Sequence, residues 1–221
     1  MNIVKFVFNP IQENTYLLWD ESRECIIIDA GNASAAENSR LTDFISEYDL
    51  KPVFVVNTHG HFDHLLGVNY LKQRYGVKFA LSSKDEYLRS MAKASCAMFG
   101  LDIDIEIPQI DIDLDTVECI SFGNTELKVI KTPGHTPGGV SLYEPISGHI
   151  FTGDTLFRES IGRTDLPGGD YSSLINSILK NLIPLGDNTI IYPGHSDKST
   201  IGHESLYNPF VVEALNGEIN Y

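Results

Sequence analysis

Short apolar runs along the chain predict strands in two groups, with helices between and after them. Several of these runs alternate apolar and polar positions, and others, such as CIIID, are continuous. The first group of predicted strands covers 3–8, 15–19, 25–29, 52–56 and 77–81. The second group covers 117–121, 126–131, 139–144, 149–152 and 189–192. We expect the first three strands to form an antiparallel sheet.

Helical spacing of apolar residues appears between these strands. Leu41, Phe44 and Ile45 share one helical face in the segment between the third and fourth predicted strands. The predicted helices cover 34–48, 64–75, 83–98 and 171–182. Two strand-rich halves, each with helices, predict an α/β fold in which two sheets pack face to face with helices outside. No linker rich in Pro and Ser divides the 221 residues, so we expect one domain over 1–221.

The charge balance restricts the partners. The chain has 16 basic and 30 acidic side chains and a formal net charge of −14, with the acids scattered. Nucleic-acid binding requires a basic surface, so nucleic acid is not expected as a partner. The N-terminal MNIVKFVFNPIQEN reaches a proline and polar residues before it could form a signal sequence, and no run is long enough to span a membrane. These features favour a cytoplasmic protein without a membrane partner, and they leave the oligomeric state open.

The three cysteines do not indicate a disulfide or thiolate site. Cys25, Cys96 and Cys119 are odd in number, far apart and without a CxxC pair. We expect reduced thiols in the interior.

The candidate chemistry lies in VVNTHGHFDHLLG, directly after the fourth predicted strand. His59 and His61 are two positions apart, so in extended chain their side chains project the same way and can converge on one metal ion. Asp63 and His64, at the turn into the next helix, can face a second ion. A helical HExxH site would instead need histidines four apart. The alternative is a solvated polar loop, but neutral imidazole is the commonest metal ligand in proteins.

Three further segments supply ligand types after predicted strands. KTPGHTPGG places His135 in a turn stiffened by Pro and Gly, IFTGDTLF places Asp154 just past a strand end, and IIYPGHS does the same for His195. A lone loop histidine is more often structural than a ligand. Together the three indicate a shared cleft, because loops at strand ends are where a scaffold directs side chains. The remaining His149 and His203 are expected to be ordinary strand-end or surface residues.

With these residues in place, the chain resembles the metallo-β-lactamase fold superfamily. HGHFDH, His135, Asp154 and His195 match its H-x-H-x-D-H signature and distal ligands, from the Asp29 region to the chain end. The likeness is closest to hydrolases similar to glyoxalase II (hydroxyacylglutathione hydrolase), as GDTLFRESIGRTDLPGGD and GHSDKSTIGHESLYNPF indicate. The resemblance implies a four-layer αβ/βα sandwich of two mixed sheets, with a two-metal site in a groove at one sheet edge.

The resemblance also implies a ligand set. It assigns the first ion to His59, His61 and His135, the second to Asp63, His64 and His195, and a bridging role to Asp154. Asp29, in IDAG, matches an acid that supports the ligands, although it could instead only cap a turn.

These residue types suit hydrolysis. A ligand set of nitrogen and oxygen atoms accepts Zn²⁺, Fe or Mn²⁺, and we expect two divalent ions, zinc before the others. Two ions roughly 4 Å apart can lower the pKa of a shared water to about 7, which generates a bridging hydroxide for attack on a carbonyl. Catalysis would then centre on Asp63 and Asp154, without a serine or cysteine nucleophile. Thiolate is a natural leaving group for such a site.

The substrate is expected to be a small thioester. Glyoxalase II enzymes carry a basic residue and a tyrosine two apart after the bridging aspartate, and a tyrosine two positions after the last histidine ligand. Here Arg163 keeps the basic residue, whereas Asp165 and Asp197 stand at the tyrosine positions, and the chain ends soon after NPF, without a basic helical segment. We therefore expect modest selectivity for the thiol portion. Arg163 with Arg158 would steer an acidic substrate group, unless these arginines only brace loops.

Two other functions remain open. The GRTD motif is also similar to persulfide dioxygenases, and His59, His135 and Asp154 provide the two imidazoles and one carboxylate of a non-haem iron oxygenase. A non-catalytic metal-binding domain is the third hypothesis. A nuclease is disfavoured by the net charge of −14, and a true β-lactamase by the lack of a signal peptide.

Overall fold

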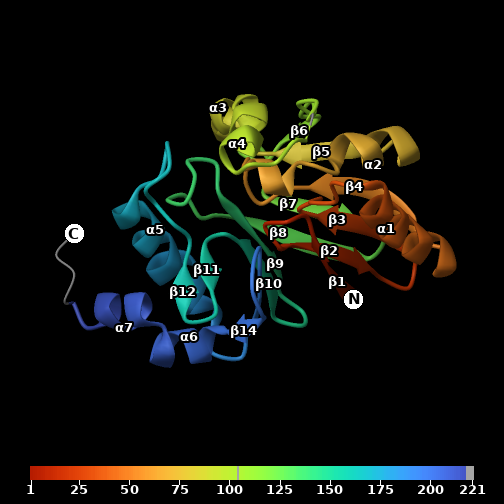
Figure 1. Cartoon of the computed structure of the whole chain (residues 1–221). Helices are drawn as coiled ribbons and strands as arrows, with labels where there is room; N and C mark the ends of the chain where they lie inside the picture. Colours follow the sequence, from red (N-terminus) through yellow and green to blue (C-terminus); the bar gives the residue numbers. More distant parts are fainter. Residues whose placement is uncertain (104, 218–221) are drawn as a thin grey trace.

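The computed structural model describes residues 1–103 and 105–217, whose strands form two six-stranded sheets and a small ribbon (Figure 1). The first sheet follows chain order, with β1 to β3 antiparallel and β3 to β6 parallel. Its strands are β1 (Asn2–Phe8), β2 (Glu13–Trp19), β3 (Glu24–Ile28), β4 (Lys51–Val56), β5 (Lys78–Leu81) and β6 (Ile112–Asp113).

The second sheet has the order β14-β13-β10-β9-β8-β7. Its strands are β7 (Cys119–Phe122), β8 (Thr125–Lys131), β9 (Val140–Glu144), β10 (His149–Gly153), β13 (Ile190–Pro193) and β14 (Ser199–Thr200). Neighbours are antiparallel except β10 and β13, which run parallel. β11 (Leu156–Phe157) and β12 (Ser160–Ile161) form the ribbon.

Alternate residues of the central strands pack into different cores, which produces the layers. In β2, Tyr16 and Leu18 join the core between the two sheets, whereas Leu17 packs with the helices on the outer face of the first sheet. In β10, Phe151 faces the inter-sheet core and Ile150 faces the helices of the second sheet. The strands are therefore buried on both faces, as the continuous apolar runs predicted.

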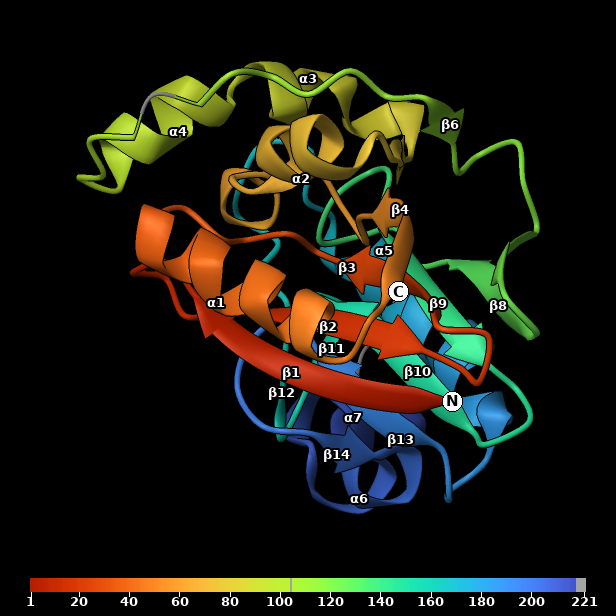
Figure 2. The same cartoon turned by 90° about the vertical axis from the view of Figure 1, so that its right-hand side faces the viewer.

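Helices cover the two outer faces (Figures 1 and 2). The helices on the first sheet are α1 (Ala35–Glu47) and α2 (Val68–Tyr75), and those on the second are α5 (Tyr171–Ser177), α6 (Ile201–Tyr207) and α7 (Pro209–Leu215). A capping box fixes the start of α1, in which the Ser34 side chain accepts from Glu37 N–H and the Glu37 side chain accepts from Ser34 N–H. The predicted α/β sandwich of two mixed sheets is confirmed. Within the described residues, no helix combines the length and apolar character that crossing a bilayer requires.

Some predicted element boundaries were wrong. The helix expected over 83–98 is divided into a 3-10 turn η2 (Ser83–Asp85) and the helices α3 (Glu86–Ser90) and α4 (Ala92–Met98). The interruption lies at Met91, whose φ of −87° and ψ of −2° depart from the angles of a regular α-helix, about −63° and −42°. The helix expected from residue 64 begins at Val68, because Phe62–His64 form a separate 3-10 turn, η1.

The two C-terminal helices α6 and α7 were not predicted. Both are only seven residues long, and their helical pattern is too short to recognise by periodicity. Their caps were visible signals, since Thr200 and Asn208 each accept a hydrogen bond from a first-turn N–H and Pro209 occupies the first position of α7.

Candidate metal centre

The first sheet delivers four of the predicted ligands from the loop after β4. His59 lies in a bend of this loop, His61 is extended with φ −70° and ψ 150°, and the η1 turn carries the buried Asp63 and His64. His59 and His64 are 2% and 0% exposed, so their polar ring nitrogens need partners inside the protein.

The second sheet delivers the other three. His135 lies in the β8–β9 loop, Asp154 follows β10 directly, and His195 comes two residues after the end of β13. Because β10 and β13 are parallel, their carboxyl ends meet at one edge of the sheet. Close approach there requires glycine, since a Cβ at Gly194 would lie 2.2 Å from Asp154 Oδ1.

The His195 loop is held by the first sheet. Asn14 of β2 donates its backbone N–H to the Gly194 carbonyl at 2.7 Å and its side-chain amide to the Pro193 carbonyl at 2.9 Å. The Tyr16 hydroxyl donates to the same Pro193 carbonyl at 2.7 Å. The loop therefore depends on both sheets for its position.

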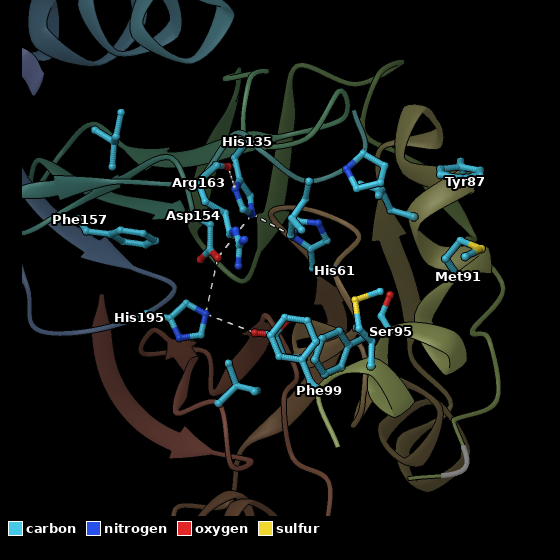
Figure 3. Close-up of a pocket in the computed structure, with 18 residues that line it drawn as sticks. His61, Tyr87, Met91, Ser95, Phe99, His135, Asp154, Phe157, Arg163 and His195 are labelled. Atoms are coloured by element: carbon cyan, nitrogen blue, oxygen red, sulfur yellow. Dashed lines mark hydrogen bonds and ion pairs between the residues drawn. The ribbon is translucent and has the colours of Figure 1, made fainter. Parts of the chain in front are cut away.

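The other six predicted ligands converge around the Asp154 carboxylate, and Figure 3 labels His61, His135 and His195 beside it. Asp154 Oδ2 lies 3.6 Å from His135 Nε2, 3.6 Å from His195 Nε2 and 3.9 Å from His59 Nε2. Its other oxygen, Oδ1, lies 3.6 Å from His64 Nε2. The carboxylate thus stands between the two predicted ligand groups, as a bridging ligand would.

Among the described residues, candidate ligand atoms form four overlapping groups, in each of which they lie within 4.8 Å of one another. Two of the groups are His59, His61 and His135, and Asp63, His64 and His195, the members that the family resemblance implied. The other two join His64 to His59 and Asp154, and to Glu13 and Asp29. His61 Nδ1 lies 2.9 Å from His135 Nε2, and His195 Nε2 lies 3.3 Å from Asp63 Oδ2.

Hydrogen bonds orient several of the imidazoles. The Nδ1 of His135 donates to the Arg163 carbonyl at 2.7 Å, and that of His195 donates to the Gln12 carbonyl at 3.3 Å. His64 Nδ1 lies 3.3 Å from Asp29 Oδ2. In each case Nε2 is left facing the centre, the arrangement that metal-binding histidines usually have.

The electrostatics favour a cation at the centre. Burial lowers the pKa of His59 well below its ordinary value, and burial together with the nearby His135 lowers that of His61 to about 4. Burial would also lower the pKa of His64, but the surrounding carboxylates outweigh this effect and raise the pKa above its ordinary value. The cluster therefore combines the neutral imidazoles of His59 and His61 with carboxylates that attract positive charge to the centre.

Buried polar atoms without a partner support the same conclusion. His59 Nε2, His64 Nε2 and Asp154 Oδ1 are buried and accept or donate no hydrogen bond within the described protein. Leaving such an atom unpaired costs about 1–3 kcal/mol, so a further binding partner for these atoms is favoured. Imidazole nitrogens and carboxylate oxygens fit Zn²⁺, Fe or Mn²⁺.

Asp29 lies directly behind the ligands. Its carboxylate accepts from the Thr58 N–H at 2.7 Å and from the Thr58 hydroxyl at 2.8 Å, and that hydroxyl lies 3.1 Å from His59 Nδ1. Together with its approach to His64, this places Asp29 against both ligand groups. Its φ of +53° is a left-handed conformation that aspartate tolerates better than most residues.

Asp85 is a residue that sequence reasoning missed. It is 0% exposed and accepts from Gly60 N–H at 2.9 Å, the Thr136 hydroxyl at 2.8 Å and Gly138 N–H at 2.6 Å. Gly60 lies between His59 and His61, and Thr136 follows His135, so Asp85 ties together the loops that carry the first ligand group. In the sequence it looks like an ordinary helix-start residue, and no local signal marks it.

Glu13 was also missed. It is completely buried beside Thr15, Asp29 and His64, and burial raises its pKa well above the usual range. Its Oε2 accepts from the Thr15 hydroxyl at 2.8 Å, while Oε1 has no hydrogen-bond partner in the described part of the chain. The only sequence signal was a charged residue at the start of a predicted strand.

The arginines and the remaining histidines lie outside the ligand cluster. Arg163 lines the pocket beside the centre, where its guanidinium forms two hydrogen bonds of 2.7 Å with Asp165. Arg158 lies 3.9 Å from Glu159 and does not line this pocket. His203 also pairs with Glu159, and His149 packs against the ring of Tyr192.

Fold and site together define a metal-binding αβ/βα sandwich enzyme. The chain belongs to the metallo-beta-lactamase superfamily, whose family model matches residues 8–195. The chain is 38% identical over 213 residues to hydroxyacylglutathione hydrolase GloC of Haemophilus influenzae, a match that covers 96% of this chain and 98% of the relative.

Two solved structures are similar to the whole fold. The BLEG-1 B3 metallo-beta-lactamase has a TM-score of 0.86 and 34% identity, with 95% of this chain and 99% of that chain covered. TTHA1623, solved in a di-iron-bound form, has a TM-score of 0.82 and 33% identity, with 94% and 99% covered. These likenesses support a metal-dependent hydrolase.

Proposed function

We propose that this protein is a thioester hydrolase of the glyoxalase II-like type that works with two divalent metal ions. The observation that carries the proposal is the Asp154 carboxylate, which stands between two groups of ligand atoms. One group consists of His59, His61 and His135, and the other of Asp63, His64 and His195. The similarity to a hydroxyacylglutathione hydrolase supports the reaction class.

When bound, two such ions polarise a carbonyl and make water acidic enough to supply a nucleophile near neutral pH. The protein's own groups prepare this chemistry. Burial would raise the pKa of Asp63, but His64 and the hydrogen bond from His195 outweigh it and hold the pKa well below the ordinary range. Asp63 is therefore an ionised acceptor that can orient water. The carbonyl would face the His59 group, and the leaving thiol the His195 group.

Arg163 is proposed to attract an acidic group on the substrate. It lines the pocket, and its position after Asp154 matches the basic residue of glyoxalase II. Its ion pair with Asp165, in which both side chains are largely exposed, partly offsets the positive charge of the guanidinium. We therefore expect only modest selectivity for the two carboxylates of a glutathione thiol. Arg158, outside the pocket, would contribute at longer range.

Metal content is the first test. We expect elemental analysis of purified or reconstituted protein to find close to two ions per chain, with zinc before iron or manganese. Trace metal after reconstitution would refute the proposal. The loaded protein should then release free thiol from simple thioesters, monitored with a thiol reagent. Oxygen uptake with glutathione persulfide and no thioester cleavage would show a dioxygenase, and two bound ions with neither reaction would show a non-catalytic domain.

A further inference from the structure

The pocket beside the metal centre has an apolar wall that the ligand cluster does not explain. The pocket has a volume of about 440 Å³, and its wall on the α3–α4 side consists of Tyr87, Leu88, Met91, Met98 and Phe99. We propose that this wall binds the acyl chain of the substrate, and that the enzyme prefers thioesters of medium-length apolar acids. This inference rests on the proposed function.

The wall is one face of a helical segment. Its residues recur at positions 87, 88, 91, 95, 98 and 99, the spacing of one helical face, with Ser95 the polar member. Although the helix is interrupted at Met91, both parts still direct this face into the pocket. Figure 3 shows Tyr87, Met91 and Ser95 beyond His61, on the side away from His195.

These side chains are exposed to a degree that folding alone does not require. Tyr87 is 60% exposed, Met91 41%, Met98 77% and Phe99 44%. Four large apolar residues gathered at one pocket are a typical ligand-binding surface. Methionine adapts its shape to different chains, because it is unbranched and flexible.

Much of the remaining pocket lining is also apolar. It includes Ile11, Phe157, Leu166 and Pro167. Among the described residues that line the pocket, Arg163 is the one Lys or Arg side chain, and it is paired with Asp165. In a chain of net charge −14, this lining offers little to an anionic acyl group but buries an apolar one well.

The wall lies on the acyl side of the proposed reaction. Phe62, between His61 and Asp63 in the chain, contacts Phe99 with ring centroids 5.3 Å apart, so the wall reaches the edge of the ligand cluster. Figure 3 shows Met91 on the His61 side of the centre, away from His195, which is the side that the carbonyl would face. His195, on the side of the leaving thiol, approaches Phe157 instead, at 6.2 Å between rings. The chain attached to the carbonyl is therefore the one that reaches Met91 and Met98.

The test compares acyl chains on one neutral thiol. Acetyl, butyryl, hexanoyl and octanoyl thioesters of N-acetylcysteamine are assayed with the metal-loaded protein. A fully buried methylene is worth roughly fourfold in affinity, so with partial burial we expect kcat/KM to rise about tenfold or more from acetyl to hexanoyl. A flat or falling series overturns the proposal. The proposal is also overturned if kcat/KM rises only when the thiol is lengthened while the acyl group stays acetyl.

Binding without catalysis separates this inference from the proposed function. Non-hydrolysable 2-oxooctyl and 2-oxopropyl thioethers of N-acetylcysteamine are titrated calorimetrically into the protein. Tighter binding of the longer ketone, even if no thioester is cleaved, supports the acyl pocket while refuting the hydrolase. Equal binding of both ketones overturns the acyl pocket whatever the activity.

Variants locate the effect on the wall. Met91→Ser and Met98→Ser replace exposed side chains, so the fold should persist, and each should lower the hexanoyl-to-acetyl ratio of kcat/KM several-fold. Ile146→Ser is the matched control, because Ile146 is 94% exposed on the β9–β10 turn and does not line the pocket. The control should keep the wild-type ratio. A wild-type ratio in both methionine variants overturns the proposal.

Discussion

Replacing Asp85 with asparagine should weaken metal binding although Asp85 contacts no metal. The carboxylate accepts three hydrogen bonds, two of them from the backbone N–H groups of Gly60 and Gly138. Asparagine has the same shape but only one acceptor oxygen, and its amide nitrogen must then face one of these N–H groups. The Thr136 hydroxyl can rotate to adapt, whereas a backbone N–H cannot.

The magnitude follows from that unpaired donor. A buried N–H without an acceptor costs about 1–3 kcal/mol, which we expect as the loss of unfolding free energy in urea titrations of metal-free protein. Substitutions behind metal ligands typically reduce metal affinity by about 10–100-fold. Because Asp85 joins the loops carrying His59, His61 and His135, the loss should fall mainly on one of the two ions. Competition titration against a chromogenic chelator measures it.

Asp20→Asn is the matched control. Asp20 is 4% exposed and also accepts from two backbone N–H groups, those of Ser22 at 2.9 Å and Asn124 at 2.6 Å. It follows the C-terminal end of β2, whereas Glu13, beside the ligands, begins this strand. It should lose similar stability and keep wild-type metal affinity. Unchanged affinity in Asp85→Asn, or an equal loss in both variants, would refute the positioning role.

Three further predictions concern other parts of the chain. Asp154→Ala should lose most activity and bound metal, whereas His149→Ala should keep both, as measured by thiol release and elemental analysis; equal behaviour would contradict the bridging assignment. Asp165→Tyr should raise kcat/KM for a glutathione thioester relative to a neutral one, because it frees the guanidinium paired with Asp165; an unchanged ratio would show that this arginine does not meet substrate. Cys119, which was wrongly expected in the interior and is exposed, should react with a thiol reagent in the native protein. Cys25 should react only on unfolding, since burial raises its pKa to about 12, and early labelling would show that this core opens.

The pattern of apolar residues was sufficient to predict the layers. In β3, Cys25 and Ile27 face the helices while Ile26 and Ile28 face the other sheet, so a continuous run correctly indicated a strand buried on both sides. Such burial depends only on local chain geometry, which the sequence contains directly.

The ligand cluster was predictable for a related reason. Each candidate side chain follows a strand, and strand ends are brought together by the sheets themselves. The structure places all seven near one another, and their roles as ligands stay a prediction, as does the organisation in one domain.

The supporting residues could not be predicted from local pattern. Asp85 acts on groups 25 to 53 positions away in the chain, and Glu13 meets His64 only after the first sheet has formed. Likewise, no glycine or proline marks the interruption of the helix at Met91. These features depend on contacts between distant segments, which hydrophobic periodicity does not encode.

The hydrogen bonds from Asn14 and Tyr16 to the His195 loop have a consequence for how the molecule opens. Bound ions would gain their full binding free energy only while the two sheets are docked, because the ligands come from both. Bound metal should therefore lower the rate of unfolding as well as raise the free energy of unfolding. The sheets should then separate rarely in the loaded protein. Hydrogen exchange at the Asn14 amide, which bonds the Gly194 carbonyl across the sheets, would report each separation as it occurs. A metal-loaded site would thus hold the two halves of the chain together, and a chelator would release them.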